Sequence, residues 1–130
     1  MDIEPNNKNN ILQEINFENL YTFNNAGTGF IVSLKSYAHS LNPVDIKLIS
    51  HVDKGSNFGF VLRGNSTSNK GTIEISNTDY NKNKHSNFCF NQWENKVSVN
   101  LKNIKHDKAN KTSKNSWCFD YKKSPLIKFN

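Results

Sequence analysis

The stretch from Asn57 to Ser76, NFGFVLRGNSTSNKGTIEIS, sets a pattern that recurs along the rest of the chain. Apolar side chains alternate with other residues in two runs, 58–62 and 73–75, and a period of two is typical of a strand with one buried face. Gly, Asn, Ser and Thr are frequent between the two runs, and these residues favour turns. The stretch therefore predicts a β-hairpin.

Similar runs lie on both sides of this stretch, and a second hairpin is expected across Glu94-Asn95. We find no helical period and no internal repeat. The sequence therefore predicts an all-β fold, a single-domain antiparallel β-sandwich of the jelly-roll or lectin-like kind with about eight or nine strands. The expected strands lie within residues 15–23, 30–37, 44–49, 58–62, 73–75, 88–93, 97–101, 117–121 and 126–129.

A chain of 130 residues has the size of one domain. Residues 1–14 are polar and Asn-rich and predict a flexible N-terminal arm, so that residues 15–130 form the β-sandwich domain. No apolar run is long enough for a membrane span or a signal peptide. The expected location is therefore cytoplasmic or virion-associated, and secretion stays open if the chain is a mature fragment behind an added methionine.

The chain is basic, with a formal net charge of +6 and a pI near 9.3. Of its 17 basic residues only Arg63 is an arginine, and the lysines are spread among many asparagines and isoleucines. This joint excess is what AT-rich codons would produce, so we attribute the charge to composition and leave a functional role open. Because arginine is favoured for bidentate phosphate and guanine recognition, sequence-specific nucleic-acid binding is not expected.

The two cysteines, Cys89 and Cys118, have matching aromatic neighbours and could lie on adjacent strands. If the aromatic side chains face the core, both thiols face away from it. A disulfide between them is possible, but the sequence lacks a secretory signal and the reduced state is the preferred interpretation. Neither cysteine has the spacing of a zinc ligand.

Residues that carry chemistry are sparse. The four histidines are scattered, and no nucleophile motif, phosphate-binding glycine loop or framed pair of carboxylates is present. We therefore predict that the protein is not an enzyme and uses no cofactor and no metal ion.

The order of the segments resembles that of the farnesoic acid O-methyltransferase-like domain. The resemblance covers residues 30 to about 101 and implies a β-sandwich that is a binding module rather than a methyltransferase. The segments that carry it are Phe30–Val32, Asp45–Ser50, Phe58–Asn65, Thr72–Ile75, Phe88–Trp93 and Val97–Val99.

Binding is the function class that remains after this elimination. Carbohydrate sites combine an aromatic ring with amide and charged groups that hydrogen-bond to hydroxyls, and five residues near strand ends supply such groups: His51, Arg63, Asn65, Trp93 and Glu94. Each also has a structural interpretation, such as core packing for Trp93 or a turn role for Asn65. We predict a non-catalytic β-sandwich module that binds carbohydrate or another polar ligand.

The alternative function is a structural or host-interaction protein, such as a viral one. Such a protein would form homo-oligomers through its sheet edges or bind a protein or nucleic-acid partner. Concentration-dependent assembly and salt-dependent binding to a polyanion would distinguish it from a glycan-binding module.

Overall fold

The structure, a computed structural model, describes the whole chain except residues 8, 36–39, 65–69, 92–95, 108–117 and 119–125. Every pairing between its described strands is parallel. The strands are β1 (Asp2–Ile3), β2 (Leu12–Glu18), β3 (Tyr21–Phe23), β4 (Thr28–Ser33), β5 (Val44–Ile49), β6 (Val52–Lys54), β7 (Phe58–Arg63), β8 (Lys70–Asn81), β9 (Ser86–Asn91), β10 (Lys96–His106) and β11 (Ile127–Phe129).

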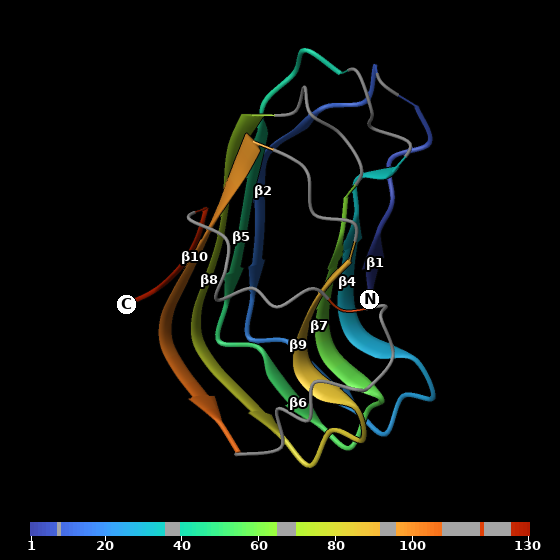
Figure 1. Ribbon diagram of the computed structural model, residues 1–130, viewed down its shortest axis with the longest axis vertical. Coiled ribbons are helices and arrows are strands. Elements are labelled where there is room, and N and C mark those ends of the chain that lie inside the picture. Colours follow the sequence, from blue (N-terminus) through green and yellow to red (C-terminus); the bar gives the residue numbers. More distant parts are fainter. Residues whose placement is uncertain (8, 36–39, 65–69, 92–95, 108–117, 119–125) are drawn as a thin grey trace.

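Two parallel sheets face each other across the core. One sheet has the order β1-β4-β7-β9, and the other has the order β11-β10-β8-β5-β2. In Figure 1 the strands β2, β5, β8 and β10 form one wall of the molecule, and β4, β7 and β9 form the opposite wall. Since the chain passes from one wall to the other and back in each turn, it winds into a β-solenoid of about three turns.

The predicted antiparallel β-sandwich is therefore wrong, as are its jelly-roll and lectin-like variants and the sandwich implied by the family resemblance. The hairpin predicted for residues 57–76 does not form, because β7 and β8 belong to different sheets. Phe60 of β7 pairs with Phe30 and Phe88, which lie one turn before and one turn after it. Partners of β7 thus come from neighbouring turns of the solenoid and not from the next strand along the chain.

The alternation of apolar side chains led to a wrong prediction of antiparallel pairing, and the reason is physical. Alternation shows that a strand has one buried face, but it does not show the direction of its partner. Parallel sheets usually have both faces covered and then give continuous apolar runs. In β5 the residues Val44, Ile46 and Leu48 are buried while Lys47 is exposed, so a parallel sheet here keeps the alternation of an antiparallel one.

A stacked corner follows β2 and β5 and bends β8 and β10 within the second sheet. Asn19, Ser50, Asn77 and Asn103 occupy equivalent positions in successive turns, and all four have positive φ angles between 49° and 58°. Asparagine adopts this left-handed conformation more readily than most residues. The Nδ2 of Asn103 donates a hydrogen bond to Oδ1 of Asn77 at 2.7 Å, which links two turns of the corner.

A second corner follows within a few residues. Asn24, Gly55 and Lys82 stack there with φ angles of 49°, 75° and 56°. Between the two corners lie β3, β6 and the C-terminal part of β8, which pair in register. The solenoid therefore has three sides, and the shortest of them is built from these segments at the lower end of Figure 1.

Columns of similar side chains fill the interior. Phe30, Phe60 and Phe88 stack across three turns with ring centroids 6.1 and 6.4 Å apart, and each is at most 2% exposed. On the opposite wall, Ile46 and Ile73 pair in register and are buried to the same degree. This repetition along the axis is what holds a solenoid together, because each turn packs chiefly on its neighbours.

The segment predicted as an arm, residues 1–14, contains β1 and the start of β2. Asp2 and Ile3 pair with Ile31 and Val32 of β4, and the N-terminal ammonium donates to the carbonyl of Gly29 at 2.8 Å. β1 thus adds a strand to the edge of the first sheet.

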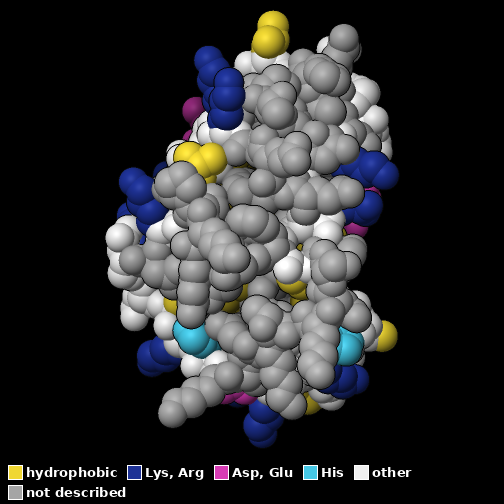
Figure 2. All heavy atoms as spheres, in the orientation of Figure 1, with side chains coloured by type: hydrophobic (Ala, Val, Ile, Leu, Met, Phe, Trp, Pro, Cys, Tyr) yellow, Lys and Arg dark blue, Asp and Glu magenta, His cyan; other side chains and the backbone are white. Residues whose placement is uncertain are grey.

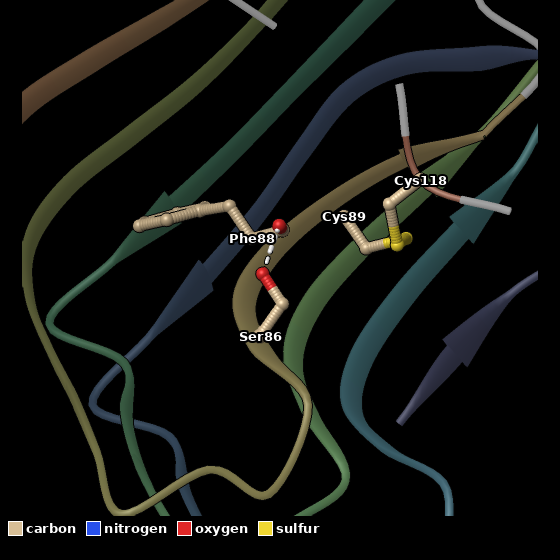
Figure 3. The surroundings of a disulfide bond; sticks show 4 residues. All are labelled: Ser86, Phe88, Cys89 and Cys118. Carbon is tan, nitrogen blue, oxygen red and sulfur yellow. Dashed lines mark hydrogen bonds between the residues drawn. A yellow bond between two sulfur atoms is a disulfide. The ribbon is translucent and has the colours of Figure 1, made fainter. Parts of the chain in front are cut away.

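A disulfide joins Cys89 to Cys118, with the two Cα atoms 5.1 Å apart. The sequence left this bond open and favoured the reduced state. Figure 3 shows the Cys89 side chain on the opposite side of β9 from that of Phe88, which faces the core, as the alternation indicated. The bond fastens Cys118 to the outer side of the first sheet, whereas β11 pairs with β10 in the second sheet.

Candidate functional site

A chain of hydrogen bonds crosses the interior between the two corners. The hydroxyl of Tyr80 lies 2.9 Å from Nδ1 of His51, and Nε2 of His51 lies 2.8 Å from Oγ1 of Thr22. Thr22 in turn donates to Oδ1 of Asp53 at 2.6 Å, and Ser56 donates to the same oxygen at 2.7 Å. These hydrogen bonds thus join three neighbouring turns of the solenoid.

The direction of these bonds defines the tautomer of His51. A threonine hydroxyl has one proton, which Thr22 gives to Asp53, so Nε2 of His51 must be the donor to Thr22. Burial lowers the pKa of this imidazole to about 4, so the ring is neutral near pH 7. Nδ1 is then an acceptor that receives the proton of the Tyr80 hydroxyl, and both ring nitrogens are bonded.

Burial explains the electrostatics of the same groups. Desolvation, followed by the positive charge of the N-terminus, lowers the pKa of His51 from 6.5 to about 4. Desolvation raises the pKa of Asp53, an effect that the hydrogen bonds from Thr22 and Ser56 oppose. Burial, followed by the nearby Asp53 charge, raises the pKa of Tyr80 well above its ordinary value.

This interior chain resembles catalytic machinery in composition but has no access for a substrate. His51, Asp53, Ser56 and Tyr80 are all 0% exposed. A Cβ atom at Gly29 would collide with the carboxylate of Asp53, so the space beside the carboxylate is filled. Within the described ranges there is also no group of three or more His, Cys, Asp or Glu that could hold a metal ion. We interpret these hydrogen bonds as a structural network that pairs most of its buried polar atoms, although Oδ2 of Asp53 has no partner among the described residues.

The outward side of the short strands presents a different surface, which we call the short-strand face. Tyr21 and Phe23 lie on it, 62% and 58% exposed, with their rings stacked at a centroid distance of 6.4 Å and an interplanar angle of 16°. The other large apolar side chains that are exposed in the described part of the chain lie outside the strands: Met1, Ile11 and Leu41. The aromatic pair is thus the most prominent apolar feature on an open sheet surface.

Polar groups continue the short-strand face beyond the aromatic pair. Tyr21 is in register with Val52, Asp79 and Lys105, so one row crosses four strands over roughly 14 Å at the usual strand spacing. A second row, beside the first, contains Phe23, Lys54 and Asn81 in register. The Nδ2 of Asn81 donates a hydrogen bond to Oδ1 of Asp79 at 2.9 Å.

A hollow of about 360 Å³ lies where this face meets the first corner. This volume is at the lower end of the range for small-molecule sites. The Asn77–Asn103 hydrogen bond holds the two corner amides in place beside it. The residues that line the hollow are Ser50, Asn77, Thr78, Asp79, Asn103 and Lys105.

Of the residues predicted from the sequence, the two that the structure describes, His51 and Arg63, do not lie on the short-strand face. His51 is inside the solenoid with both ring nitrogens bonded, and Arg63 is at the far end of β7, in register with Ser33 and Asn91. The Nε of Arg63 is buried and has no partner among the described residues. Asn65, Trp93 and Glu94 lie outside the described residues.

The sequence analysis placed Tyr21 and Phe23 in one expected strand, within residues 15–23, together with Ile15 and Phe17. The left-handed corner at Asn19 changes the direction of the chain, so the first pair faces solvent while Phe17 packs on the core. A signal was present: the corner residue recurs as Asn19, Ser50, Asn77 and Asn103, each two residues after an apolar strand position.

The Lys and Arg side chains of the described residues that are visible in Figure 2 lie around the outline of the face drawn. The attribution of the charge to composition and the absence of sequence-specific nucleic-acid binding both stay predictions. In comparisons with known proteins, no family model, curated protein or solved structure matches the chain.

Proposed function

We propose that the protein is a non-catalytic β-solenoid binding module whose short-strand face binds carbohydrate. The observation that carries this proposal is the stacked and exposed Tyr21–Phe23 pair on an open sheet surface. Aromatic rings supply large, rigid and amphipathic contact area, which suits the apolar faces of sugar rings. The neighbouring carboxylate, amides and ammonium groups of the face supply both acceptors and donors for hydroxyls.

The non-enzymatic part of the proposal has its own support. The histidine and aspartate of the interior network, His51 and Asp53, are buried and already bonded to each other through Thr22. Among the described residues that the register places on its two rows, the short-strand face carries one carboxylate, Asp79, whereas an acid and base pair across a bond needs two.

The alternative, self-assembly through sheet edges, is opposed at one end of the solenoid. β2 lies at the edge of its sheet and carries Glu14 and Glu18. Its pairing is interrupted between Leu12 and Ile15, where Glu14 has a φ angle of 56°. Charges and irregularities of this kind protect natural edge strands from pairing with other chains.

The location is a proposal as well. The Cys89–Cys118 bond favours an oxidising compartment over the cytoplasm, because disulfides persist mainly in secreted and cell-surface proteins. Among the described residues, no helix is long and apolar enough to cross a membrane.

Loss of the aromatic pair tests the proposed function. The wild-type protein and the Tyr21→Ala/Phe23→Ala variant are applied to a glycan array, and hits are measured by titration calorimetry. Leu41→Ala is the matched control, because it removes an exposed apolar side chain from another part of the surface. We expect the double variant to lose binding without a change in its melting curve, whereas an array without hits would refute the proposal.

A further inference from the structure

Asp79 and Lys105, which line the hollow, lie on the same row of the short-strand face as Tyr21. Tyr21 and Asp79 are two strand spacings apart, or roughly 10 Å. A ligand that stacks on the rings and extends across the strands therefore reaches the hollow with its next units.

The charges of the hollow restrict the chemistry of the ligand. Asp79 contributes one carboxylate and Lys105 one ammonium group, so the lining has no net charge. An anionic group placed there would face the carboxylate of Asp79, and a cationic group would face Lys105. Like charges in such positions oppose binding, which leaves a neutral polar group as the best occupant.

The remaining groups suit hydroxyls. Each carboxamide offers donors and an acceptor, and the corner amides of Asn77 and Asn103 are fixed by their mutual hydrogen bond and by their backbone conformation. Ser50 adds a hydroxyl that can donate or accept. Neighbouring hydroxyls of a sugar ring can therefore donate to Asp79 and accept from Lys105 or an amide.

From this juxtaposition we propose that the hollow is a second subsite and that the ligand is a neutral oligosaccharide lying across the strands. One sugar ring stacks on Tyr21 and Phe23, and a later ring places two neighbouring hydroxyls in the hollow. This inference rests on the proposed function, because it assumes that the aromatic pair is the first subsite.

The test uses calorimetric titration of the full chain with a panel of neutral gluco-, manno- and xylo-oligosaccharides and with polygalacturonate as the acidic probe. Asp79→Asn is the principal variant, because it keeps the size of the side chain and removes its charge. Asp45→Asn is the matched control, since Asp45 is partly exposed on β5 and does not line the hollow. Circular dichroism confirms that each variant keeps its sheet content.

We expect a neutral oligosaccharide to bind, Asp79→Asn to weaken it by roughly tenfold, as for the loss of one hydrogen bond to a charged group, and Asp45→Asn to have no effect. Binding that is lost with the aromatic pair but unchanged in Asp79→Asn would overturn the second subsite and leave the proposed function intact. If polygalacturonate bound more tightly than the neutral oligosaccharides, and Asp79→Asn strengthened this binding, the proposal of a neutral ligand would be overturned. No binding of any probe would refute both proposals together. If Asp79→Asn fails to fold, Asn103→Ala takes its place, and the same loss of oligosaccharide affinity is expected for it.

Discussion

Acid should destabilise this protein through His51. The imidazole is neutral in the folded chain, and its pKa falls from 6.5 to about 4 because of burial. Between these values the unfolded chain binds a proton that the folded chain excludes. Stability attributable to His51 is therefore complete above pH 6.5 and is lost progressively as the pH falls toward 4.

The size of the effect follows from the shift. A difference of about 2.5 pKa units corresponds to about 3 kcal/mol at 1.36 kcal/mol per unit. This is a large part of the 5–15 kcal/mol that holds a typical domain together. Asp53 acts in the opposite direction, because its pKa is raised and its contribution is present at low pH and lost as the pH rises.

Urea denaturation between about pH 7.5 and pH 4.5 measures the unfolding free energy of the wild type and of His51→Gln. The variant is expected to be less stable near neutral pH, because it breaks the bonds to Thr22 and Tyr80, but its stability should depend less on acid. The difference between the two pH profiles isolates His51 from Asp53. The exposed His106 supplies the control, and His106→Gln should keep the wild-type profile. Equal profiles for the wild type and His51→Gln would refute the reasoning.

Further predictions concern the stability of the solenoid and are measured by denaturation. Phe60→Ala should cost about 3–5 kcal/mol, because the ring is fully buried in the middle of the aromatic column; a loss below about 1 kcal/mol would contradict this packing. Gly59→Ala should be destabilising by about 1–3 kcal/mol, because the new Cβ would lie 2.7 Å from the backbone oxygen of Asn87, and an unchanged midpoint would argue against that close approach. Reduction of the Cys89–Cys118 bond, which spans 29 residues, should cost about 3.5 kcal/mol on the chain-entropy model, and Cys89→Ser/Cys118→Ser should then be insensitive to reductant.

The sequence was sufficient to predict where many strands lie and several of their core positions, because alternation indicates burial. Phe60, Leu62, Ile73 and Ile75 are all buried as their positions indicated. It was not sufficient to predict how the strands pair. Strands in neighbouring turns are separated by about 30 residues, and the connections between them differ in length, so the repeat was missed.

The candidate site was less accessible to sequence reasoning than the fold. Exposure of Tyr21 and Phe23 depends on the corner at Asn19, and asparagine is so frequent in this chain that a single corner residue attracts no notice. The row from Tyr21 to Lys105 joins four segments that meet only through parallel pairing in register. His51 was predicted to bind ligand because a histidine near a strand end usually lies on the surface. Here its side chain is buried in the core and hydrogen-bonded to Thr22 and Tyr80.

The most direct test of the binding face is a nuclear magnetic resonance titration of the isotope-labelled wild-type protein with the neutral oligosaccharide panel. We predict shift changes at Tyr21, Phe23, Asp79 and the side-chain amide of Asn103, with none at Lys47 on the outer side of β5. Shift changes confined to residues around Arg63, or a bound ligand that leaves the aromatic pair unperturbed, would contradict the assignment of the short-strand face.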